Sequence, residues 1–306
     1  MKIITSLEEL KKSNLPPSVM ALGTFDGIHL GHEDVISTAK KVAEKNKILT
    51  TVFTFSNHPL SEIEPNKVPP ILITTEDKIK FFEDAGVDVL ISVPFTEKLS
   101  KISPGDFVLL LGENNVKTIV VGENFTYGYL GKGNITSLKK DAIGFNIEII
   151  VRDLIHMDDM VVSSTNIRHL INEGNIKLAN KMLGRPYYIE GVVSHGQQRG
   201  RTINFPTANL DLKRGFFALP KLGVYAAKVE CDDKEYNALV NIGKNPTFPE
   251  KVLRLEAHLL GFTGDLYAKR IKVLLYDYVR GEIKFKSIED LKNQIILDKE
   301  KIKKML

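Results

Sequence analysis

The hydrophobic pattern of the first 150 residues alternates between short apolar runs and stretches with helical periodicity. Five runs are rich in aliphatic and β-branched residues and are bounded by Gly, Pro or polar residues, which is typical of buried strands. They cover residues 18–22, 48–55, 87–93, 117–122 and 147–151. Strands that alternate with helices predict an α/β fold with a doubly wound, mainly parallel sheet.

The stretches between these runs carry helix signals. Residues 33–44 place an apolar stripe on one helical face, which consists of Val35, Ile36, Ala39, Val42 and Ala43. Residues 75–85 begin with a good N-cap and stop at Gly86. Ser103 is a cap followed by Pro104 at a first helical position. Each predicted helix follows a predicted strand, as a parallel sheet requires.

The pattern changes near Arg185 and Pro186. Beyond them, short strand-like segments punctuated by Gly follow one another without helices between them, at residues 188–194, 223–230, 236–241, 253–262 and 270–279. Such a series predicts an antiparallel barrel or sandwich. Ser287 then caps a last helix, with Leu291, Ile295, Ile302 and Met305 roughly along one side. We predict two domains, an α/β domain over residues 1–184 and a small antiparallel β-barrel with a C-terminal helix over residues 185–306.

The composition excludes several classes of protein. The 306 residues are 43% hydrophobic, and 42 Lys and Arg against 38 Asp and Glu give a net charge of +4, too small to indicate nucleic-acid binding. Cys231 is the single cysteine, which excludes an intramolecular disulfide and a multi-cysteine metal site. No apolar run approaches the roughly 18 residues of a membrane span, and acidic residues interrupt the N-terminal stretch. We expect a cytoplasmic protein without a membrane segment; its oligomeric state is not indicated.

The most informative stretch is residues 23–32, Gly-Thr-Phe-Asp-Gly-Ile-His-Leu-Gly-His. It lies where the first predicted strand turns into a helix, so unpaired backbone N–H groups favour an anion there. Glycines allow a close approach, and His29 and His32 can donate hydrogen bonds to phosphate oxygens. The stretch indicates a nucleotide polyphosphate site, although a strand–turn–helix with glycines is also common without such a role. Its candidate binding residues are Gly23, Phe25, Asp26 and Gly31.

Two further segments belong to the same candidate site. After the fourth strand, glycines bracket Asn124 and two aromatic residues at the expected ligand edge; the alternative is a loop with an aromatic residue packed inward. Residues 128–133 lack the spacing of a phosphate-binding P-loop. Residues 162–168 open a helix, for which Ser163 or Ser164 is the cap. Arg168 in that helix is a candidate phosphate clamp, which would give a second positive helix end at the same anion.

The second informative stretch is residues 191–209. Gly196 and Gly200 bracket a loop with two arginines, including Arg201, which suits phosphate but equally suits an RNA-binding or a solvated loop. Thr207 and Asn209 offer a hydroxyl and an amide oxygen, ligands that Mg²⁺ accepts beside phosphates and water. Farther along, Glu256 lies in an apolar run, where a carboxylate is costly without a partner or a task; the alternative is an outward-facing Glu on a strand.

These motifs together resemble those of a known family. Residues 23–32 resemble the signature of nucleotidyltransferases, and their Phe-Asp-Gly form is most similar to that of the prokaryotic bifunctional riboflavin kinase/FAD synthetases. Residues 163–168 resemble the Ser-Ser-Thr-x-Ile-Arg motif of the same family, and residues 183–187 its domain junction. The run that starts at His195 resembles the riboflavin kinase signature. Similarities continue at residues 220–225, 241–248 and 255–259.

The resemblance implies two reactions: riboflavin and ATP give FMN, then FMN and ATP give FAD and pyrophosphate. It implies that His29 and His32 stabilise the triphosphate and the transition-state charge. Asn124 would orient the flavin phosphate or the nucleotide, and Arg168 would hold phosphates. In the kinase domain, Thr207 and Asn209 would hold Mg²⁺ and ATP phosphates.

Glu256 would be the general base for the ribityl hydroxyl. Three positions depart from the family pattern: Asn204 and Ala268 stand where Gly is usual, and Gly261 stands where Asp is common. None is a proposed catalytic group. Two alternatives stay open, an enzyme that keeps only one activity and a flavin- or nucleotide-binding regulator without turnover.

Overall fold

The chain folds into two compact units. The computed structural model describes residues 1–194, 207–212, 217–232, 234–244 and 253–306. The first unit contains residues 1–69 and 73–163, and the second contains residues 70–72 and 164–306. The predicted boundary between residues 184 and 185 separates two functional domains, and it stays a prediction. The packing of the chain divides it elsewhere, between Ser163 and Ser164.

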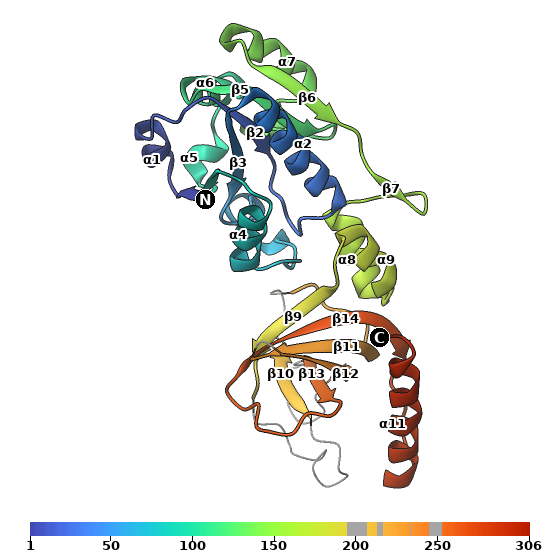
Figure 1. The fold of residues 1–306 in the computed structure, drawn as a ribbon. Helices are drawn as coiled ribbons and strands as arrows, with labels where there is room; N and C mark the ends of the chain where they lie inside the picture. The colour runs from blue at the N-terminus through green and yellow to red at the C-terminus, as the bar shows by residue number, and fades with distance from the viewer. Residues whose placement is uncertain (195–206, 213–216, 233, 245–252) are drawn as a thin grey trace. The chain divides into compact units, whose positions relative to one another are not determined.

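The first unit is built on a six-stranded sheet with the order β1-β4-β3-β2-β5-β6. Every pairing in it is parallel, which confirms the predicted doubly wound sheet (Figure 1). Its strands are β1 (Lys2–Ile4), β2 (Ser18–Leu22), β3 (Leu49–Phe55), β4 (Val89–Val93), β5 (Val116–Gly122) and β6 (Glu148–Arg152). The five predicted strands are all present, and β1 is an additional edge strand.

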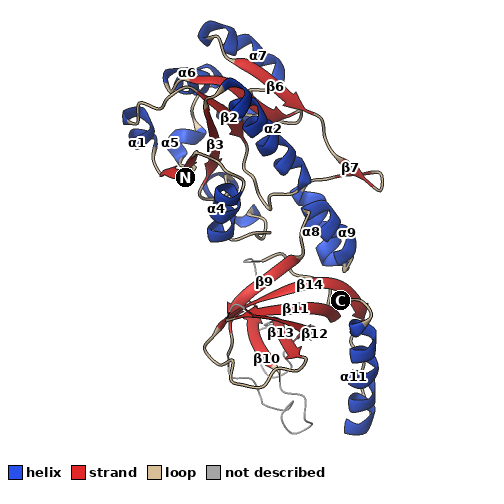
Figure 2. Ribbon diagram, viewed as in Figure 1, coloured by secondary structure: helices blue, strands red, loops and turns tan. Residues whose placement is uncertain are grey.

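Helices cover both faces of this sheet (Figure 2). Side chains of β2 alternate between the faces: Val19 and Ala21 belong to one apolar cluster, Met20 and Leu22 to the other. The first cluster includes the predicted stripe of α2 (Leu30–Asn46) and residues of α4 (Thr75–Asp84). The second includes α6 (Pro104–Glu113), capped by Ser103 as predicted, and α7 (Ile135–Ala142). The remaining elements are α1 (Leu7–Lys12), α3 (Leu60–Ile63), α5 (Glu97–Ser100), the 3-10 turns Pro65–Lys67, Tyr129–Gly131 and Ile143–Phe145, and the hairpin β7 (His156–Met157) and β8 (Met160–Val161).

The second unit combines two helices with a curled antiparallel sheet. Its described strands have the order β10-β13-β12-β11-β14-β9, and the bridge between Ser194 and Asn209 joins the two edges of the sheet. This confirms the predicted small β-barrel. The strands are β9 (Tyr187–Val192), β10 (Ala208–Leu212), β11 (Gly223–Cys231), β12 (Lys234–Lys244), β13 (Leu253–Leu259) and β14 (Arg270–Arg280).

The helices α8 (Ser164–Glu173) and α9 (Ile176–Leu183) pack with the barrel. Asn180 explains part of this packing, because its amide donates to the Leu275 carbonyl at 2.8 Å. The same amide group accepts from the Tyr187 N–H at 2.7 Å. An amide that binds two barrel strands fixes the helix pair to the sheet by directional bonds rather than by apolar contact alone.

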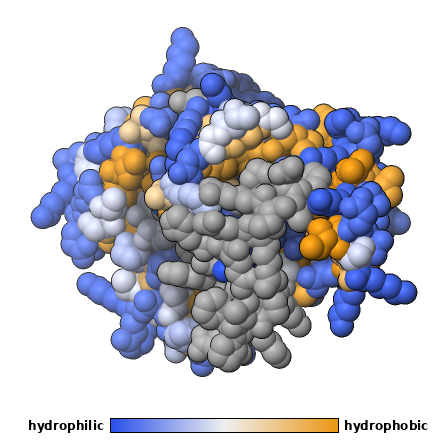
Figure 3. Space-filling model, turned by 90° about the horizontal axis from the view of Figure 1, so that it is seen from below, coloured by the Kyte–Doolittle hydropathy of each residue, from blue (hydrophilic) through white to orange (hydrophobic). Residues whose placement is uncertain are grey.

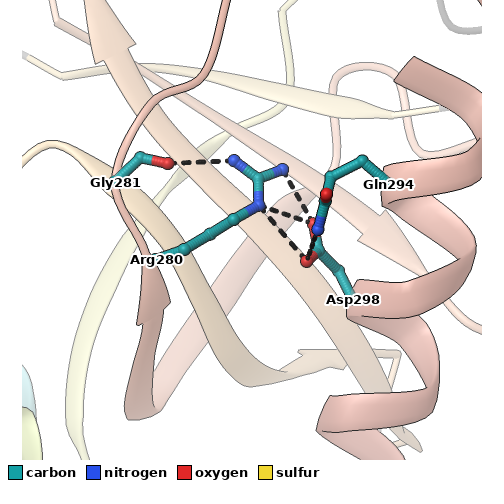
Figure 4. A network of polar contacts seen from close by, with 4 residues as sticks. All are labelled: Arg280, Gly281, Gln294 and Asp298. Atoms are coloured by element: carbon teal, nitrogen blue, oxygen red, sulfur yellow. Dashed lines mark hydrogen bonds and ion pairs between the residues drawn. The ribbon is translucent and has the colours of Figure 1, made fainter. Parts of the chain in front are cut away.

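The C-terminal helix α11 (Ile288–Lys303) lies against the outer face of the barrel and is capped by Ser287 as predicted. Ile302 is buried and Ile295 packs beside it, whereas Met305 is exposed. The helix also carries a buried charge (Figure 4): Asp298 is 1% exposed. Arg280 of β14 donates to its carboxylate at 2.7 and 2.9 Å. The sequence pattern predicts the apolar stripe of α11 but not this ion pair.

Candidate active sites

The loop between β2 and α2 has an unusual backbone. Phe25, Gly27 and Ile28 all have positive φ, at 47°, 79° and 40°. The two non-glycine residues in this left-handed region cost about 1–2 kcal/mol each. Both side chains are buried, at 1% and 0% exposure, so the apolar core stabilises a conformation that the local chain disfavours. Backbone strain of this kind persists only where the surrounding fold maintains it, and it is common at functional sites.

Two histidines stand at the end of this loop. His29 is the N-cap of α2, and its Nδ1 accepts a hydrogen bond from the His32 backbone N–H at 3.4 Å. In a neutral imidazole this places the proton on Nε2, which makes that nitrogen a donor. The two rings stack with centroids 3.7 Å apart, and the edge of Phe25 contacts His32 at 5.3 Å. The arrangement presents imidazole donors at a helix N-terminus, which is suited to phosphate oxygens.

The glycines of the motif make room for these rings. A Cβ on Gly23 would lie 3.1 Å from the Phe25 ring. A Cβ on Gly31 would lie 3.3 Å from the His29 ring and 3.8 Å from the Val162 carbonyl oxygen. The sequence predicts that these glycines allow the close approach of an anion, and the structure adds tight ring packing as a second reason for them.

The neighbouring loop follows β5, which pairs with β2 in the sheet. The chain order reverses on either side of β2, so the loops after β2 and β5 share the edge at which ligands bind in such folds. Asn124 is exposed in this loop. Tyr127 is buried, stacks on Phe125 and lies within 3.4 Å of Ser137 and Asp141. Tyr127 therefore takes the alternative role, an aromatic residue packed inward.

An ion pair fixes α2 to the same edge of the sheet. Arg152 at the end of β6 donates to Asp34 in the first turns of α2 at 2.6 and 3.1 Å. The Asp34 carboxylate raises the pKa of the Arg152 guanidinium. Arg152 also pairs with Gly122 at the end of β5. No sequence spacing predicts this contact, because Asp34 and Arg152 are far apart in the chain.

A half-buried lysine also contacts the signature loop. Lys78 of α4 donates to the Thr24 carbonyl at 2.6 Å and to the Thr54 hydroxyl at 2.9 Å. Burial lowers the pKa of Lys78 to about 8, although the Asp26 carboxylate opposes the shift. No sequence motif indicates this lysine, because Lys78 is one of several charged residues on a helix of ordinary composition.

Two predicted residues of this site lie in the second unit. Ser164 is the first residue of α8, and Arg168 follows one turn later. The Arg168 Nε donates to the Pro70 carbonyl at 2.7 Å, so one of its donors binds backbone of its own unit. Their predicted role at the phosphates stays a prediction.

The barrel carries a row of polar side chains across three strands. Glu256 of β13 pairs in register with Asn209 of β10 on one side and with Asn241 of β12 on the other. Residues directly opposite each other project from the same face and lie close together. The next residues along β13, Leu255 and Ala257, are fully buried and face the barrel interior. Glu256 therefore shares the outer face with two amides rather than with the apolar core.

Asn209 is 6% exposed, and its Nδ2 donates to the Thr207 carbonyl at 3.3 Å. Its amide oxygen and the Thr207 hydroxyl are neutral oxygen ligands of the kind that Mg²⁺ accepts together with phosphates. Within the described ranges, no group of three or more His, Cys, Asp or Glu could hold a metal ion. The remaining predicted residues of this site, His195, Gly196, Gly200 and Arg201, lie outside the described residues, as does Asn204.

The other two positions that depart from the family pattern, Gly261 and Ala268, differ in how well the residue suits its backbone conformation. Gly261 has φ 74°, a conformation that suits glycine. Ala268 has φ 59°, in the left-handed region where its Cβ is strained. The N–H of Ala268 donates to the Val193 carbonyl at 3.1 Å. Neither position is among the residues proposed for chemistry, so both bear on stability first.

Family models match both halves of the chain. A model described as FAD synthetase matches residues 11–166, and one described as riboflavin kinase matches residues 183–306. A bifunctional riboflavin kinase/FMN adenylyltransferase of Bacillus subtilis (strain 168) is 42% identical over 303 residues, covering 97% of this chain and 95% of the relative. The protein of the same description from Escherichia coli (strain K12) is 32% identical and covers 97% and 96%.

A solved structure shares the fold over the same length. A crystal structure described as a macrolide-efflux protein from Streptococcus pneumoniae superimposes with a TM-score of 0.86, at 31% identity and 97% coverage of both chains. Among the described residues, no helix is long and apolar enough to cross a membrane. On the face shown in Figure 3, apolar groups are interspersed among hydrophilic ones.

Proposed function

This chain belongs to the bacterial bifunctional riboflavin kinase/FMN adenylyltransferase family, and from that premise we propose which residues serve each reaction. The enzyme phosphorylates riboflavin to FMN with ATP, and it adenylylates FMN to FAD with release of pyrophosphate. We assign residues 1–184 to the adenylyltransferase domain and residues 185–306 to the kinase domain. The gap between the two family models, residues 167–182, supports a boundary near this point.

Adenylylation is assigned to the strained loop and the start of α2. A phosphate oxygen of FMN attacks the α-phosphorus of ATP, and the bond to the leaving pyrophosphate breaks. The Nε2–H of His29, together with His32 and the helix N-terminus, stabilises negative charge that develops on the phosphates. The observation that carries this assignment is the cap bond between the His29 Nδ1 and the His32 N–H, because it defines which nitrogen donates.

Four further residues are assigned to adenylylation with supporting roles. Asn124 is exposed at the neighbouring loop, where it can orient the flavin phosphate or the nucleotide. Ser164 and Arg168 belong to the start of a helix, and a guanidinium with a helix N-terminus suits phosphate. Asp26 contributes the electrostatic partner of Lys78.

Phosphorylation is assigned to the outer face of the barrel. Glu256 accepts the proton of the ribityl terminal hydroxyl as its oxygen attacks the γ-phosphorus of ATP. The flanking amides of Asn209 and Asn241 support this role, since they can hold the hydroxyl and the phosphate beside the base. Thr207 and Asn209 would hold Mg²⁺, which neutralises phosphate charge when bound. His195, Gly196, Gly200 and Arg201 are assigned to ATP by their motif alone.

The product spectrum tests the proposed function. Purified protein is incubated with riboflavin, ATP and Mg²⁺, and the flavins are separated by chromatography. We expect FMN first and FAD after it, and no conversion when the metal is chelated. FMN alone, or FAD from supplied FMN alone, would mean that one domain is inactive. A protein that binds flavin but forms neither product would be a regulator, which would contradict both assignments. We also propose a cytoplasmic location, where ATP is available.

A further inference from the structure

We propose that Lys78 is a positioning residue for FMN adenylylation, which maintains the strained loop that leads to His29 and His32. This inference rests on the proposed function of the two histidines. Lys78 lies on α4, outside every motif that the sequence indicates. Its ammonium contacts a backbone carbonyl of the loop. All the groups in the argument belong to the first compact unit.

The geometry is a closed triangle of hydrogen bonds. The Lys78 Nζ donates to the Thr24 carbonyl at 2.6 Å and to the Thr54 hydroxyl at 2.9 Å. The Thr54 hydroxyl donates in turn to the same Thr24 carbonyl at 3.0 Å. A carbonyl oxygen has two acceptor positions, and two donors from different elements converge on this one. Helix α4 and strand β3 therefore both hold one carbonyl at the start of the loop.

This carbonyl directly precedes the strained residues. Phe25 follows Thr24 with φ 47°, and Ile28 has φ 40° immediately before His29. The buried side chains of Phe25 and Ile28 anchor the loop from within the core. The Thr24 carbonyl is the backbone anchor at its entrance. A loop that relaxed toward ordinary φ would shift the helix cap, and with it the stacked imidazoles.

The choice of lysine argues against a purely structural role. Burial lowers the pKa of Lys78 to about 8, and the nearby Asp26 carboxylate only partly opposes this effect. Partial desolvation of an ammonium disfavours the folded state, so an apolar side chain of similar length would stabilise this half-buried position more. An ammonium offers up to three donors, which allows it to bind the carbonyl and the hydroxyl together.

The test is Lys78→Met, which keeps the length and removes the donors. We expect the kcat for FAD formation from supplied FMN to fall about 10- to 100-fold, the range that small misplacements cause. The KM values for ATP and FMN should stay within about threefold, because binding in the ground state is not the affected step. Riboflavin phosphorylation and the thermal unfolding midpoint should not decrease. Lys80→Met, at an exposed position of the same helix, is the matched control and should leave kcat unchanged.

A Lys78→Met protein with an unchanged kcat for adenylylation would overturn the inference. If this variant does not fold, Thr54→Val decides: it removes one donor to the Thr24 carbonyl, so kcat should fall about three- to tenfold. A folded Thr54→Val protein with normal kcat would also overturn it. A failure of the proposed function of the two histidines would give a different result from a failure of this inference. In that case the wild-type protein would form no FAD, or His29→Ala would retain FAD formation.

Discussion

The two candidate sites, both proposed to bind ATP, are built from different parts of the chain. In the first unit, a contiguous loop of ten residues combines backbone strain, a helix N-terminus and two histidines. In the second, Asn209, Glu256 and Asn241 come from three strands and meet only through the register of an antiparallel sheet. The first site is thus a property of local sequence, and the second is a property of strand pairing.

This difference follows from how each sheet presents groups. In a parallel sheet the strand ends meet at one edge, and the loops that leave them supply backbone N–H groups and strained turns. In an antiparallel barrel, the alternating side chains of each strand form an inner apolar face and an outer polar face. Sequence motifs are readable in the first case because the functional groups are neighbours in the chain.

The largest expected effect separates the two sites. We expect His29→Ala to reduce FAD formation from supplied FMN by about 100- to 1000-fold, because it removes a donor to developing charge. It should leave FMN formation unchanged. Glu256→Gln should do the reverse and reduce FMN formation by about 100- to 10,000-fold, since the amide cannot accept the proton. Both rates are measured in each variant, so each variant is the control for the other.

Retained FAD formation in His29→Ala would refute the assignment of the first site. An unchanged kinase rate in Glu256→Gln would refute the base role and favour the alternative of a Glu that is simply on the strand surface. Loss of both activities in either variant would mean that the two units are not independent in catalysis, which would break the comparison itself.

The next effect concerns the stability of the barrel unit. Asp298→Ala leaves the guanidinium of Arg280 buried without its carboxylate, which typically costs about 3–5 kcal/mol. We expect kinase activity to be lost at a lower temperature than adenylylation, measured as residual activity after heating. The double variant Arg280→Met with Asp298→Leu should recover most of the loss, because a packed apolar pair replaces the buried charges.

Glu300→Ala is the matched control for this experiment. Glu300 lies on the same helix and pairs with Lys303 at 2.8 Å, but both side chains are about 60% exposed. Water screens such a pair, so its removal should not change the inactivation temperature. If Asp298→Ala were as stable as Glu300→Ala, the ion pair would not be what fixes α11 to the barrel.

The smallest expected effect concerns the left-handed backbone conformation of Ala268 and its influence on stability. Ala268→Gly should raise the free energy of unfolding of the barrel unit by about 0.5–1 kcal/mol, because φ 59° strains alanine but not glycine. Gly261→Ala is the reverse exchange at φ 74°, where a Cβ would meet no atom within 4 Å. It should lower the stability by a similar amount, measured by denaturant unfolding. A destabilised Ala268→Gly protein would contradict the strain argument.

Local patterns predicted most of the fold. Apolar runs marked the five strands of the first sheet, and Ser103 and Ser287 cap helices as their sequence context indicates. These features depend on neighbours within a few residues, so a single sequence contains the information. Strands β1 and β10 were missed, the first because it is three residues long and the second because it lies within a motif read for chemistry.

Side-chain partners were predicted less well than elements. The sequence indicated that Glu256 needs a partner or a task but not that Asn241 lies beside it. Lys78 gave no signal, because its role depends on Thr24 and Thr54 from two other elements. No local pattern predicted the ion pair of Arg280 and Asp298, because it joins β14 to the lysine-rich helix α11. Each case depends on distance in space between residues that are far apart in the chain.

The sequence by itself determined the two folds and the loop of His29 and His32, because these depend on local propensity, periodicity and contiguous motifs. It indicated the class of chemistry because those motifs resemble a known family. Only the tertiary structure decided which nitrogen of His29 donates, which amides flank Glu256 and which lysine holds the strained loop. The physical reason is that strand register and helix packing bring distant groups within hydrogen-bond distance, and no local pattern encodes those distances.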